Sequence, residues 1–490
     1  MSGALRLDTL LAGIAPAPSL GLRGLALDSA AIRPGDVFVA LRGSQQHGGR
    51  FAADAVARGA VAVLSDETLD APPLPLAVPV LVIDGLRQHL GLIAARCYGT
   101  DDRALEVIGV TGTNGKTSCV TLLAQALNAL GRSAATIGTL GVSYSTHCWP
   151  SARTTPDVLR LHALLAELAA AGARQVAMEV SSHALDQARV AGVHFRIAAF
   201  TNLSRDHLDY HDTMARYFAA KARLFLELAP ALAVVNCDDP WGQRLLQLLP
   251  QAMPRCSYSA SGDQAADWRA EAVEPSRDGL AFSLVGPSGR ALVSTALLGR
   301  FNVANLLLVA ACMDALGIAL DDIARALAGA TPVPGRMNRL GGDGIRPLVV
   351  IDYAHTPDAL EQALLALREH APGKLIVVFG CGGERDPGKR PQMGAIAERL
   401  AEQLIVTDDN PRGEDGAAII AAIQSGMRDP AKARIERDRR LAIAAAIAQA
   451  RSADTVLIAG KGHEQFQEIA GVERPFDDLR EAASALERAA

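Results

Sequence analysis

The stretch Glu106–Ser118, EVIGVTGTNGKTS, decides how the chain is organised. An apolar run over Val107–Val110 stops at the loop TGTNGKT, residues 111–117, and a helix-forming segment continues to Leu127. A strand, a glycine-rich loop and a helix N-terminus in this order favour phosphate binding. The loop turns backbone N–H groups inward, and the helix adds a partial positive charge. The alternative interpretation is an ordinary glycine-rich turn between a strand and a helix.

Within this loop, Lys116 and Thr117 have the chemistry of a nucleoside triphosphate site. Lys116 would reach the terminal phosphates, and the Thr117 hydroxyl would be a ligand of Mg²⁺. The spacing departs from the common pattern, which has glycine six residues before the lysine. That position is Val110, and Gly109 comes one residue too early. We therefore interpret the loop as a variant P-loop for ATP or GTP, and the loop alone does not indicate the reaction.

Length and composition narrow the classes of protein to consider. A chain of 490 residues suggests roughly three domains, and 49% hydrophobic with 21% charged residues is typical of globular proteins. The net charge of −5 gives no case for a nucleic-acid partner. No apolar run is long enough to span a bilayer, and the N-terminus lacks the pattern of a signal peptide. The seven cysteines contain no CxxC pair, which favours reduced thiols in a cytosolic protein over a metal site.

The chain divides into three stretches in which expected strands and helices alternate. Residues 1–98 predict a small α/β unit, residues 99–335 predict repeated βαβ units around the P-loop, and residues 336–490 restart the alternation. Thr331–Arg336, TPVPGR, is expected to be a linker, because proline and glycine oppose both helix and strand. The predicted fold class is α/β with three domains. The central domain has a mostly parallel sheet with the P-loop, and the C-terminal domain is a Rossmann-like α/β domain.

Polar clusters follow most of the apolar runs in the second and third stretches. In open α/β sheets ligands bind beyond the carboxyl ends of the strands, so each of these two domains is expected to hold a ligand. The clusters are EVSSH at 179–183, TNLSRDH at 201–207, NCDD at 236–239, DYAH at 352–355, GCGGERD at 380–386, TDDNPR at 407–412 and AGKGHE at 459–464.

Two residues of the second stretch have metal-binding chemistry. Glu179 and His207 are expected to end adjacent strands and to hold Mg²⁺, His207 less comfortably because Mg²⁺ favours oxygen ligands. The alternative for His207 is a hydrogen-bonded histidine at a strand end. Lys221 lies in a helical pattern, and its spacing alone predicts an exposed lysine.

The third stretch places arginines and acidic residues together. Arg385 and Arg412 lie in glycine- or proline-rich loops and would pair with a carboxylate, while Asp409, Asn410 and Glu464 would bind an ammonium group. One pocket that binds both groups describes an amino-acid site. The alternative is that the arginines form salt bridges that stabilise the loops.

Taken in order, the motifs TGTNGKTS, EVSSHALDQ, TNLSRDHLDYH, GRFNVANL, PGRM, DYAHTPDAL, GCGGERD, DNPR and GKGHE resemble those of the Mur ligases over essentially the whole chain. Within that family the chain is similar to the MurE type. The resemblance implies an ATP-dependent ligase that adds meso-diaminopimelate to UDP-N-acetylmuramoyl-L-alanyl-D-glutamate through an acyl phosphate. It also implies Mg²⁺, a monomer, and a place in cytoplasmic peptidoglycan precursor synthesis, hence in cell wall biogenesis, cell shape and cell division.

The resemblance also implies roles for single residues. The ATP site would comprise Gly112, Thr113, Asn114, Gly115, Lys116, Thr117, Ser118, Asn302, Arg336, Asp352 and His355. The metal ligands would be Thr117, Glu179, His207 and Lys221 as a carbamate, and Lys116, His207 and Lys221 would be catalytic. The UDP-muramoyl dipeptide would meet Leu27, Ser29, Ser44, Gln45, Gln46, Thr154, Thr155, Ser181, Gln187 and Arg189. Diaminopimelate would meet Arg385, Asp409, Asn410, Pro411, Arg412, Gly460 and Glu464.

Selectivity would depend on the loop Asp409–Arg412, DNPR, in which lysine-adding relatives differ. Diaminopimelate has a distal carboxylate that lysine lacks. Polar groups of this site would therefore stay unpaired when lysine binds. The domain that binds the amino acid would swing about Pro334–Gly335 to deliver the amine. Four alternatives stay open at this point: a folylpolyglutamate synthetase-like ligase, a lysine-adding Mur ligase, the sister ligase that adds D-Ala-D-Ala, and a P-loop regulatory or motor NTPase.

Overall fold

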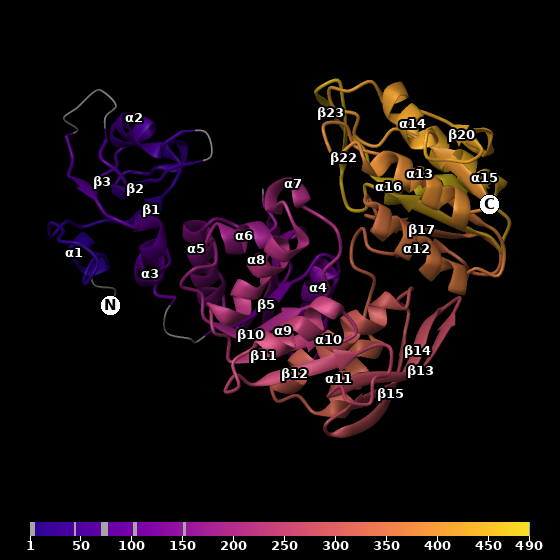
Figure 1. Cartoon of the computed structure of the whole chain (residues 1–490), viewed down its shortest axis with the longest axis horizontal. Coiled ribbons are helices and arrows are strands. Elements are labelled where there is room, and N and C mark those ends of the chain that lie inside the picture. Colours follow the sequence, from indigo (N-terminus) through magenta and orange to yellow (C-terminus); the bar gives the residue numbers. More distant parts are fainter. Residues whose placement is uncertain (1–4, 44–45, 70–76, 101–104, 150–152, 490) are drawn as a thin grey trace.

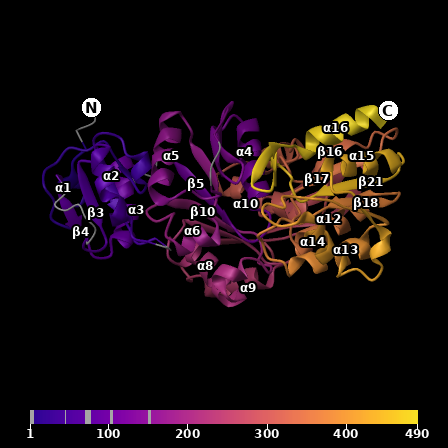
Figure 2. The ribbon, with the colours of Figure 1, turned by 90° about the horizontal axis from the view of Figure 1, so that it is seen from above.

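Three sheets follow one another along the chain and lie in the same order in space. The computed structural model describes residues 5–43, 46–69, 77–100, 105–149 and 153–489. The N-terminal sheet lies at one end of an elongated molecule, the C-terminal sheet at the other, and the largest sheet lies between them (Figures 1 and 2). No helix in these ranges is long and apolar enough to cross a membrane.

The N-terminal sheet is small and parallel, in the order β1-β2-β3-β4. Its elements are α1 (Leu7–Leu10), β1 (Gly24–Ala26), β2 (Asp36–Ala40), α2 (Ala52–Ala57), β3 (Ala62–Ser65), β4 (Val80–Val82) and α3 (Leu86–Tyr98). Helix α3 covers one face, where Ile93 and Ala94 meet Val37 and Leu64. A 3-10 turn over Gly48–Phe51 precedes the short helix α2.

The central sheet has eleven strands in the order β15-β14-β13-β12-β11-β10-β5-β9-β6-β7-β8. The strands from β13 to β6 run parallel, and β5, the strand of the P-loop, lies among them. These parallel strands are β5 (Glu106–Thr111), β6 (Ala134–Gly138), β9 (Gln175–Glu179), β10 (Phe195–Phe200), β11 (Leu232–Asn236), β12 (Arg255–Ser259) and β13 (Trp268–Ser276). The expected mostly parallel sheet is therefore confirmed.

Helices cover both faces of the central sheet, as alternating side chains in its strands require. Ile108 and Val110 of β5 face the cluster with α4 (Lys116–Ala129), α10 (Phe301–Ala315) and α11 (Leu320–Ala328). Val107 of the same strand faces the opposite cluster. That second layer contains α5 (Val158–Ala170), α6 (Ser182–Asp186), α8 (Met214–Leu226) and α9 (Pro240–Leu248), with the short α7 (Leu208–His211) at its end.

Antiparallel strands extend both edges of the central sheet. They are β7 (Gly141–Tyr144) and β8 (His147–Trp149) at one edge, and β14 (Gly279–Gly286) and β15 (Gly289–Thr295) beyond β13 at the other. Four strands form within residues 250–298. The second half of β13 alternates between half-buried and exposed residues, so it has no continuous apolar run.

The C-terminal sheet has six strands in the order β16-β17-β21-β18-β19-β20, all parallel except β16. The strands are β16 (Asn338–Gly341), β17 (Leu348–Asp352), β18 (Leu375–Phe379), β19 (Gln403–Val406), β20 (Ala433–Ile435) and β21 (Thr455–Ala459). One face packs on α12 (Pro357–His370), α13 (Lys389–Leu400) and α14 (Gly416–Gln424), the other on α15 (Arg439–Gln449) and α16 (Asp478–Ala489). A hairpin of β22 (Phe466–Ile469) and β23 (Val472–Pro475) stands apart.

The N-terminal and central parts meet through α3 and α5, a contact that we call the N-terminal junction. Val158 and Leu159 of α5 belong to the same apolar cluster as Ile93 of α3. Gly91 lies against the turn at Ala191, where a Cβ atom on Gly91 would be 2.4 Å from the Ala191 carbonyl carbon. The two parts are thus joined by apolar side chains and by direct backbone contact.

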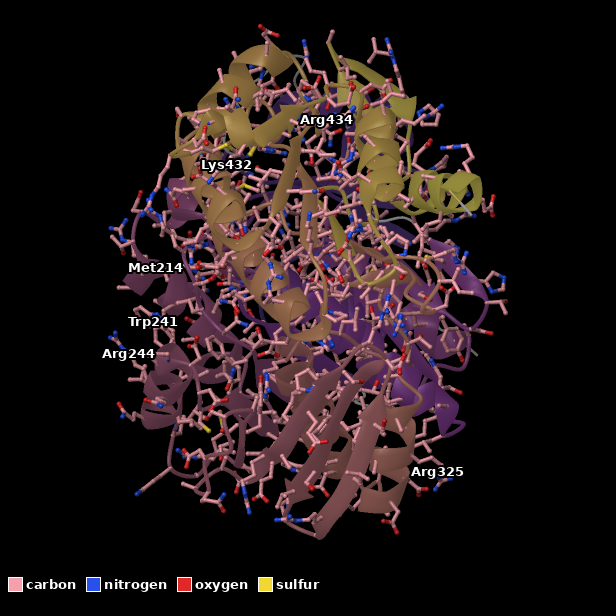
Figure 3. All side chains as sticks on the ribbon, turned by 90° about the vertical axis from the view of Figure 1, so that its right-hand side faces the viewer. Met214, Trp241, Arg244, Arg325, Lys432 and Arg434 are labelled. Carbon is pink, nitrogen blue, oxygen red and sulfur yellow. The ribbon has the colours of Figure 1, made fainter. Side chains whose placement is uncertain are left out.

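The central and C-terminal parts meet through polar groups and through Leu298, which packs in the apolar cluster of the C-terminal part. We call this contact the C-terminal junction. His370, at the end of α12, accepts a hydrogen bond from Gly299 N at 2.9 Å through Nε2 and donates to Ser276 O at 2.5 Å through Nδ1. Arg339 donates to Asp278 O at 3.0 Å, and Arg277 donates to Ser452 O. Figure 3 views the molecule from this end, with the C-terminal sheet above and the antiparallel strands β13, β14 and β15 of the central sheet below it.

Candidate active site at the carboxyl ends of the strands

The P-loop joins β5 to α4 as the sequence predicts. Gly115 precedes α4 in a left-handed conformation, with φ of 86°. Gly112 has φ of 150°, and a Cβ atom on it would lie 1.8 Å from Thr201 Oγ1. Only glycine fits there, because Thr201 itself bonds the loop by donating to Asn114 O at 2.6 Å. The loop is therefore held from β10 as well as from its own strand.

Two lysines converge on one carbonyl of this loop. Lys116 Nζ donates to Gly112 O at 2.9 Å and to Thr113 O at 2.8 Å, and Lys221 Nζ donates to the same Gly112 O at 2.7 Å. Lys221 is 1% exposed, with its ammonium 4.5 Å from the centroid of the Tyr217 ring. Burial, reinforced by Lys116, holds the pKa of Lys221 well below its ordinary value. The prediction from spacing that Lys221 is exposed was wrong, because it lies on the buried face of α8.

Glu179 is a buried carboxylate at the end of β9. Its Oε1 accepts a hydrogen bond from Thr117 Oγ1 at 3.0 Å and another from Thr139 N at 2.8 Å. A hydroxyl and a carboxylate side by side next to the P-loop are oxygen donors of the kind that Mg²⁺ prefers, so this pair fits a magnesium ion. Within the described ranges, no three or more His, Cys, Asp or Glu side chains come together to hold a metal. A metal here would therefore need ligands of other kinds as well.

His207 lies farther from Glu179 along the sheet than we expected. The strand order is β10-β5-β9, so β5 separates the two strands that were predicted to be adjacent. His207 follows β10, has a φ of 53°, and its Nε2 lies 3.3 Å from Asp206 Oδ2. Its ring lies 4.9 Å from that of His183 and 6.1 Å from that of Tyr217. His207 thus borders the P-loop from the side opposite Glu179.

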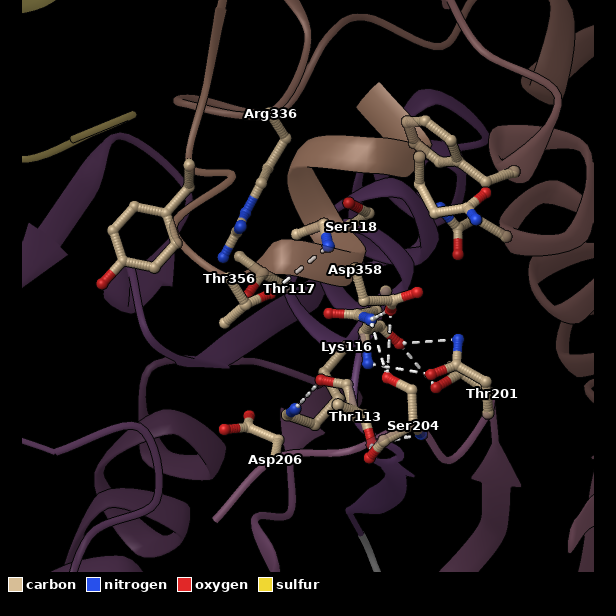
Figure 4. A pocket seen from close by; sticks show the side chains of 18 of the residues that line it. Thr113, Lys116, Thr117, Ser118, Thr201, Ser204, Asp206, Arg336, Thr356 and Asp358 are labelled. Carbon is tan, nitrogen blue, oxygen red and sulfur yellow. Dashed lines mark hydrogen bonds between the residues drawn. The ribbon is translucent and has the colours of Figure 1, made fainter. Parts of the chain in front are cut away.

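A cavity of about 600 Å³ opens in front of the P-loop, between the central and C-terminal parts. Its central wall includes Lys116, Thr117, Ser118, Glu179 and His207, and its C-terminal wall includes Arg336, Asp352 and His355. Figure 4 shows Lys116 and Thr117 on one side and Arg336 on the other. Burial raises the pKa of Asp352 and lowers that of His355. Asn302 lies one layer behind the wall, where it accepts a hydrogen bond from the lining residue Asn305 at 2.9 Å.

Several residues of this cavity escaped sequence reasoning. Asp358, in the first turn of α12, accepts hydrogen bonds from Asn114 Nδ2 and Ser204 Oγ, both at 3.1 Å, and so connects the two walls (Figure 4). Tyr353 also lines the cavity. Both lie inside the motif DYAHTPDAL, whose polar residues were the available signal. Asn114 and Ser204, the partners of Asp358, lie 244 and 154 residues away from it in the chain. The sequence pattern around Asp358 cannot show contacts over such separations.

The residues expected to meet the muramoyl dipeptide form one connected patch beside Glu179. Thr155 Oγ1 donates to Glu179 O at 2.9 Å and accepts from Ser181 N at 3.2 Å. Arg189 donates to Thr155 O at 3.2 Å and to Gln187 Oε1 at 3.0 Å. Thr154 and Ser181 also line the cavity. A substrate held on this patch would therefore have one end at the P-loop.

A second cluster lies at the ends of β18, β19 and β21. Arg412 has a left-handed φ of 53°, and hairpin strand β22 holds it there, because Arg412 N donates to Glu468 O at 3.1 Å. Its side chain donates to Gly383 O at 2.7 Å and lies 3.4 Å from Glu468. Asn410 Nδ2 donates to Glu464 at 2.8 Å. A Cβ atom on Gly460 would lie 2.3 Å from Asp409 Oδ2, so these two residues are in contact. Pro411 follows in the same loop, and Arg385 is exposed beside it.

Tyr353 lies between the cavity and this second cluster. The Arg336 guanidinium is 4.6 Å from the centroid of its ring, and the ring of His463 is 5.2 Å away. Burial raises the pKa of Tyr353, and the charges of Glu464 and Asp409 raise it further. The Tyr353 side chain thus contacts Arg336 in the C-terminal wall of the cavity, and it is close enough to Asp409 and Glu464 of the second cluster to feel their charges.

The residues expected to bind uridine diphosphate lie in the N-terminal part, away from the cavity lining. Ser29 is buried in a 3-10 turn whose cap, Asp28, accepts from Ala30 N. Leu27 is half-buried against the N-terminal core, and Gln46 accepts a hydrogen bond from Arg50 at 3.1 Å. Ser44 and Gln45 lie outside the described residues.

Comparison with known proteins identifies the family. The descriptions "Mur ligase family, catalytic domain", "Mur ligase middle domain" and "Mur ligase, glutamate ligase domain" match residues 22–98, 110–313 and 335–462. A protein of Xanthomonas campestris pv. campestris (strain 8004), named UDP-N-acetylmuramoyl-L-alanyl-D-glutamate–2,6-diaminopimelate ligase, is 53% identical over 490 residues, covering 99% of this chain and 98% of the relative. The chain belongs to the Mur ligase family. The resemblance seen in its motifs is thereby confirmed, and the chain is an ATP-dependent ligase that forms an amide bond.

Two further similar proteins match this chain over nearly its whole length. A ligase of the same name from Xylella fastidiosa (strain 9a5c) is 52% identical and covers 99% of this chain and 98% of its own. A solved structure titled as UDP-N-acetylmuramoyl-L-alanyl-D-glutamate–2,6-diaminopimelate ligase is 37% identical, with a TM-score of 0.74 and coverage of 99% of both chains. The fold class predicted from the sequence is confirmed by this similarity and by the sheets themselves.

Proposed function

We propose that this Mur ligase adds meso-diaminopimelate to UDP-N-acetylmuramoyl-L-alanyl-D-glutamate, with ATP as the energy source. The observation that carries the proposal is the cluster at Asp409–Arg412, which places a guanidinium and the carboxylates of Asp409 and Glu464 around the ends of β19 and β21. A ligand with carboxylate and ammonium groups fits that charge pattern. The 53% identical relative of the same length carries the name of this activity, which supports the choice of amino acid.

ATP would occupy the cavity of about 600 Å³, with its phosphates on the P-loop. The start of α4 provides N–H donors for a polyphosphate, whereas Thr113 N and Asn114 N already donate to Asn202. Lys116 would turn from Gly112 O and Thr113 O to the terminal phosphates. Arg336, Asp352 and His355 would meet the nucleoside and the phosphates from the opposite wall, and Asn302 would support them through Asn305.

The substrate's terminal carboxylate would attack the terminal phosphate of ATP and form an acyl phosphate and ADP. That attack brings two anions together, so positive charge fixed near both of them lowers the barrier. Lys116 lies where it offsets this repulsion. A magnesium ion on Thr117 and Glu179 would add Lewis-acid stabilisation of the phosphate charge. Lys221 as a carbamate, together with His207, would complete the ligands of the bound metal, as the family resemblance implies.

The dipeptide patch would aim the substrate at this point. Thr155, Ser181, Gln187 and Arg189 form one hydrogen-bonded set that ends at Glu179, and Thr154 is linked to Glu179 through Thr139. Because the glutamyl end must reach the P-loop, the uridine diphosphate would extend toward the N-terminal part, where Leu27, Ser29 and the loop at 44–46 would bind it. The uridine nucleotide substrate would then span stretches 1–98 and 99–335, ATP would lie between 99–335 and 336–490, and diaminopimelate would lie in 336–490.

The amine of diaminopimelate would attack the acyl phosphate and expel inorganic phosphate, leaving the new amide. Arg385 and Arg412 would pair with carboxylate groups of the amino acid, while Asp409, Asn410, Gly460 and Glu464 would surround its ammonium. The cluster is separated from the cavity by Tyr353, so delivery of the amine requires the C-terminal part to move, with Pro334–Gly335 as the hinge. The enzyme would act as a monomer in the cytoplasm, in the synthesis of peptidoglycan precursors.

The deciding experiment measures phosphate release by the purified protein with Mg²⁺, ATP and UDP-N-acetylmuramoyl-L-alanyl-D-glutamate. Diaminopimelate and L-lysine are added in separate reactions, and a reaction without the uridine nucleotide serves as the control. The expected result is turnover in the reaction with diaminopimelate and none in the reaction with L-lysine. Equal turnover with L-lysine would refute the assigned amino acid, and turnover without the uridine nucleotide would refute the assigned acceptor.

A further inference from the structure

Lys461, in the turn that follows β21, is a cation inside the C-terminal part. Its side chain is 0% exposed. Lysine is almost never fully buried unless it is paired, because moving an ammonium group out of water is costly. A lysine kept in such a position therefore has partners that need its charge.

Its partners are two residues of the amino-acid cluster. Lys461 Nζ donates to Asn410 Oδ1 at 2.9 Å and to Glu464 Oε2 at 3.0 Å, and it lies 5.7 Å from the centroid of the Phe466 ring. The lysine thus joins the loop after β19 to the turn after β21. Sequence reasoning named Asn410 and Glu464 but passed over the lysine between them.

The lysine determines which way the Asn410 amide points. Asn410 Oδ1 accepts from Lys461 Nζ and from Glu468 N, the latter at 3.0 Å, while Asn410 Nδ2 donates to Glu464 Oε2 at 2.8 Å. The reversed amide would place its NH₂ group against two donors. Asn410 is therefore held in one orientation.

The lysine also fixes the Glu464 carboxylate. Oε2 accepts from both Lys461 Nζ and Asn410 Nδ2, whereas Oε1 accepts no hydrogen bond within the described part of the chain. The Glu464 side chain is 24% exposed, so the carboxylate reaches the surface of the pocket. One oxygen is fixed inside by two donors, and the other is left for a ligand.

We propose that Lys461 is a positioning residue for the amino-acid substrate, acting through Asn410 and Glu464 rather than by touching the substrate. The inference rests on the proposed function for the identity of that substrate. Without the Lys461 ammonium, Glu464 loses a charge-assisted hydrogen bond, and its carboxylate is free to turn toward water. Binding of the amino acid then includes the cost of ordering this group again.

The test is the substitution Lys461→Met, compared with Lys374→Met. Lys374 is exposed and precedes β18, at the end of the same sheet opposite to the cluster. Steady-state kinetics are measured for all three substrates. We expect the KM for diaminopimelate to rise by about tenfold or more, as for loss of a hydrogen bond to a charged group. The KM values for ATP and the uridine nucleotide stay near those of the wild type, and Lys374→Met leaves all three unchanged.

A purely structural lysine would give a different result. Thermal unfolding of each variant is measured with and without ADP, and Lys461→Gln replaces the methionine variant if that protein does not fold. An unchanged KM for diaminopimelate, or an equal rise in all three KM values, would overturn the proposal.

A second comparison tests whether Lys461 acts through Glu464. In Glu464→Gln, the further change Lys461→Met should raise the KM for diaminopimelate by less than it does in the wild type. A full additional increase would overturn the proposal. Absence of turnover by the wild-type protein with diaminopimelate would instead count against the proposed function.

Discussion

The two junctions of this Mur ligase differ in the balance of apolar and polar contacts. At the N-terminal junction, Gly91 of α3 meets the backbone at Ala191, and Val158 and Leu159 complete an apolar cluster. At the C-terminal junction, polar groups line a cavity of about 600 Å³, Asp358 bonds Asn114 on the opposite wall, and His370 bonds Gly299 outside the cavity lining.

This difference indicates which part of the molecule moves. Opening an apolar contact exposes its surface to water, at roughly 25 cal/mol per Å², so the N-terminal part is held in place. Polar groups that separate form hydrogen bonds with water instead, and the net loss is small. We infer that the N-terminal part is a fixed anchor and that the C-terminal part opens and closes over the cavity.

The sharpest contrast comes from a variant at the cavity that changes activity without changing stability. Lys116→Ala removes the ammonium that would offset charge on the phosphates, and it breaks no contact at the N-terminal junction. We expect kcat to fall by about 10²–10³ or more, as when one stabilising donor is lost, with the free energy of unfolding close to that of the wild type. Phosphate-release kinetics and urea unfolding measure the two quantities, with Lys374→Ala as the control. A variant with near-normal kcat would remove Lys116 from the reaction.

The opposite signature is expected at the N-terminal junction. Gly91→Val puts side-chain atoms where a Cβ already lies 2.4 Å from the Ala191 carbonyl carbon. Overpacking of this kind costs about 1–3 kcal/mol of unfolding free energy, and we expect the KM for the uridine nucleotide to rise while kcat per folded molecule changes less. Denaturant unfolding provides the measurement. Gly21→Val is the matched control, because nothing lies within 4 Å of a Cβ atom there. Equal unfolding free energies for the two variants would contradict the close contact at this junction.

Acid should weaken the C-terminal junction at His370. Burial lowers the pKa of His370 below its ordinary value of 6.5, and the ring accepts a hydrogen bond from Gly299 N. As the pH falls, His370 therefore becomes protonated in the unfolded chain before it does so in the folded protein. The contribution of His370 is complete above about pH 6.5 and is lost as the pH falls below that value. Unfolding free energies from pH 7.5 to 5 should fall less steeply in His370→Gln than in the wild type. Identical slopes would show that this histidine does not couple the junction to pH.

The smallest effect is expected from the exposed ion pair of the C-terminal junction. Arg300 lies 2.8 Å from Glu369, and the two side chains are 50% and 38% exposed. Exposed pairs are typically worth less than about 1 kcal/mol, so Arg300→Ala should change stability and kcat little. A double-mutant cycle with Glu369→Ala at low and high salt measures the coupling. A coupling well above that value would mean that charge, more than hydrogen bonding, holds the junction closed.

The local features of the site were predictable from the sequence. The P-loop at 111–117 follows from an apolar strand, two glycines and a helix start that are contiguous in the chain. The loop at 407–412 was predicted for the same reason, since each polar cluster directly follows its own apolar run. Parallel strands then bring their carboxyl ends to one edge of the sheet, which is why residues far apart in the chain were expected to meet.

What the sequence did not show depends on the order of the strands in the sheet. Nothing in the chain indicates that β5 lies between β9 and β10, so Glu179 and His207 were wrongly expected on neighbouring strands. Lys221 was misjudged because its burial comes from packing of α8 on the sheet, and Lys461 was passed over because its partners come from two loops. The roles of the single site residues, and the domain boundaries, remain predictions.

The position of Tyr353 has a consequence for inhibitor design. Its ring is in contact with Arg336, in the wall where ATP is proposed to bind, and with His463, beside the proposed amino-acid cluster. A compound that links a nucleotide mimic to an amino-acid mimic must pass around this ring or displace it, so the length and shape of the linker matter more than the strength of either end. A resistance mutation of Tyr353 would alter the fit of both halves of the compound. The same mutation would also change the surroundings of both natural substrates that are proposed to bind on the two sides of this ring.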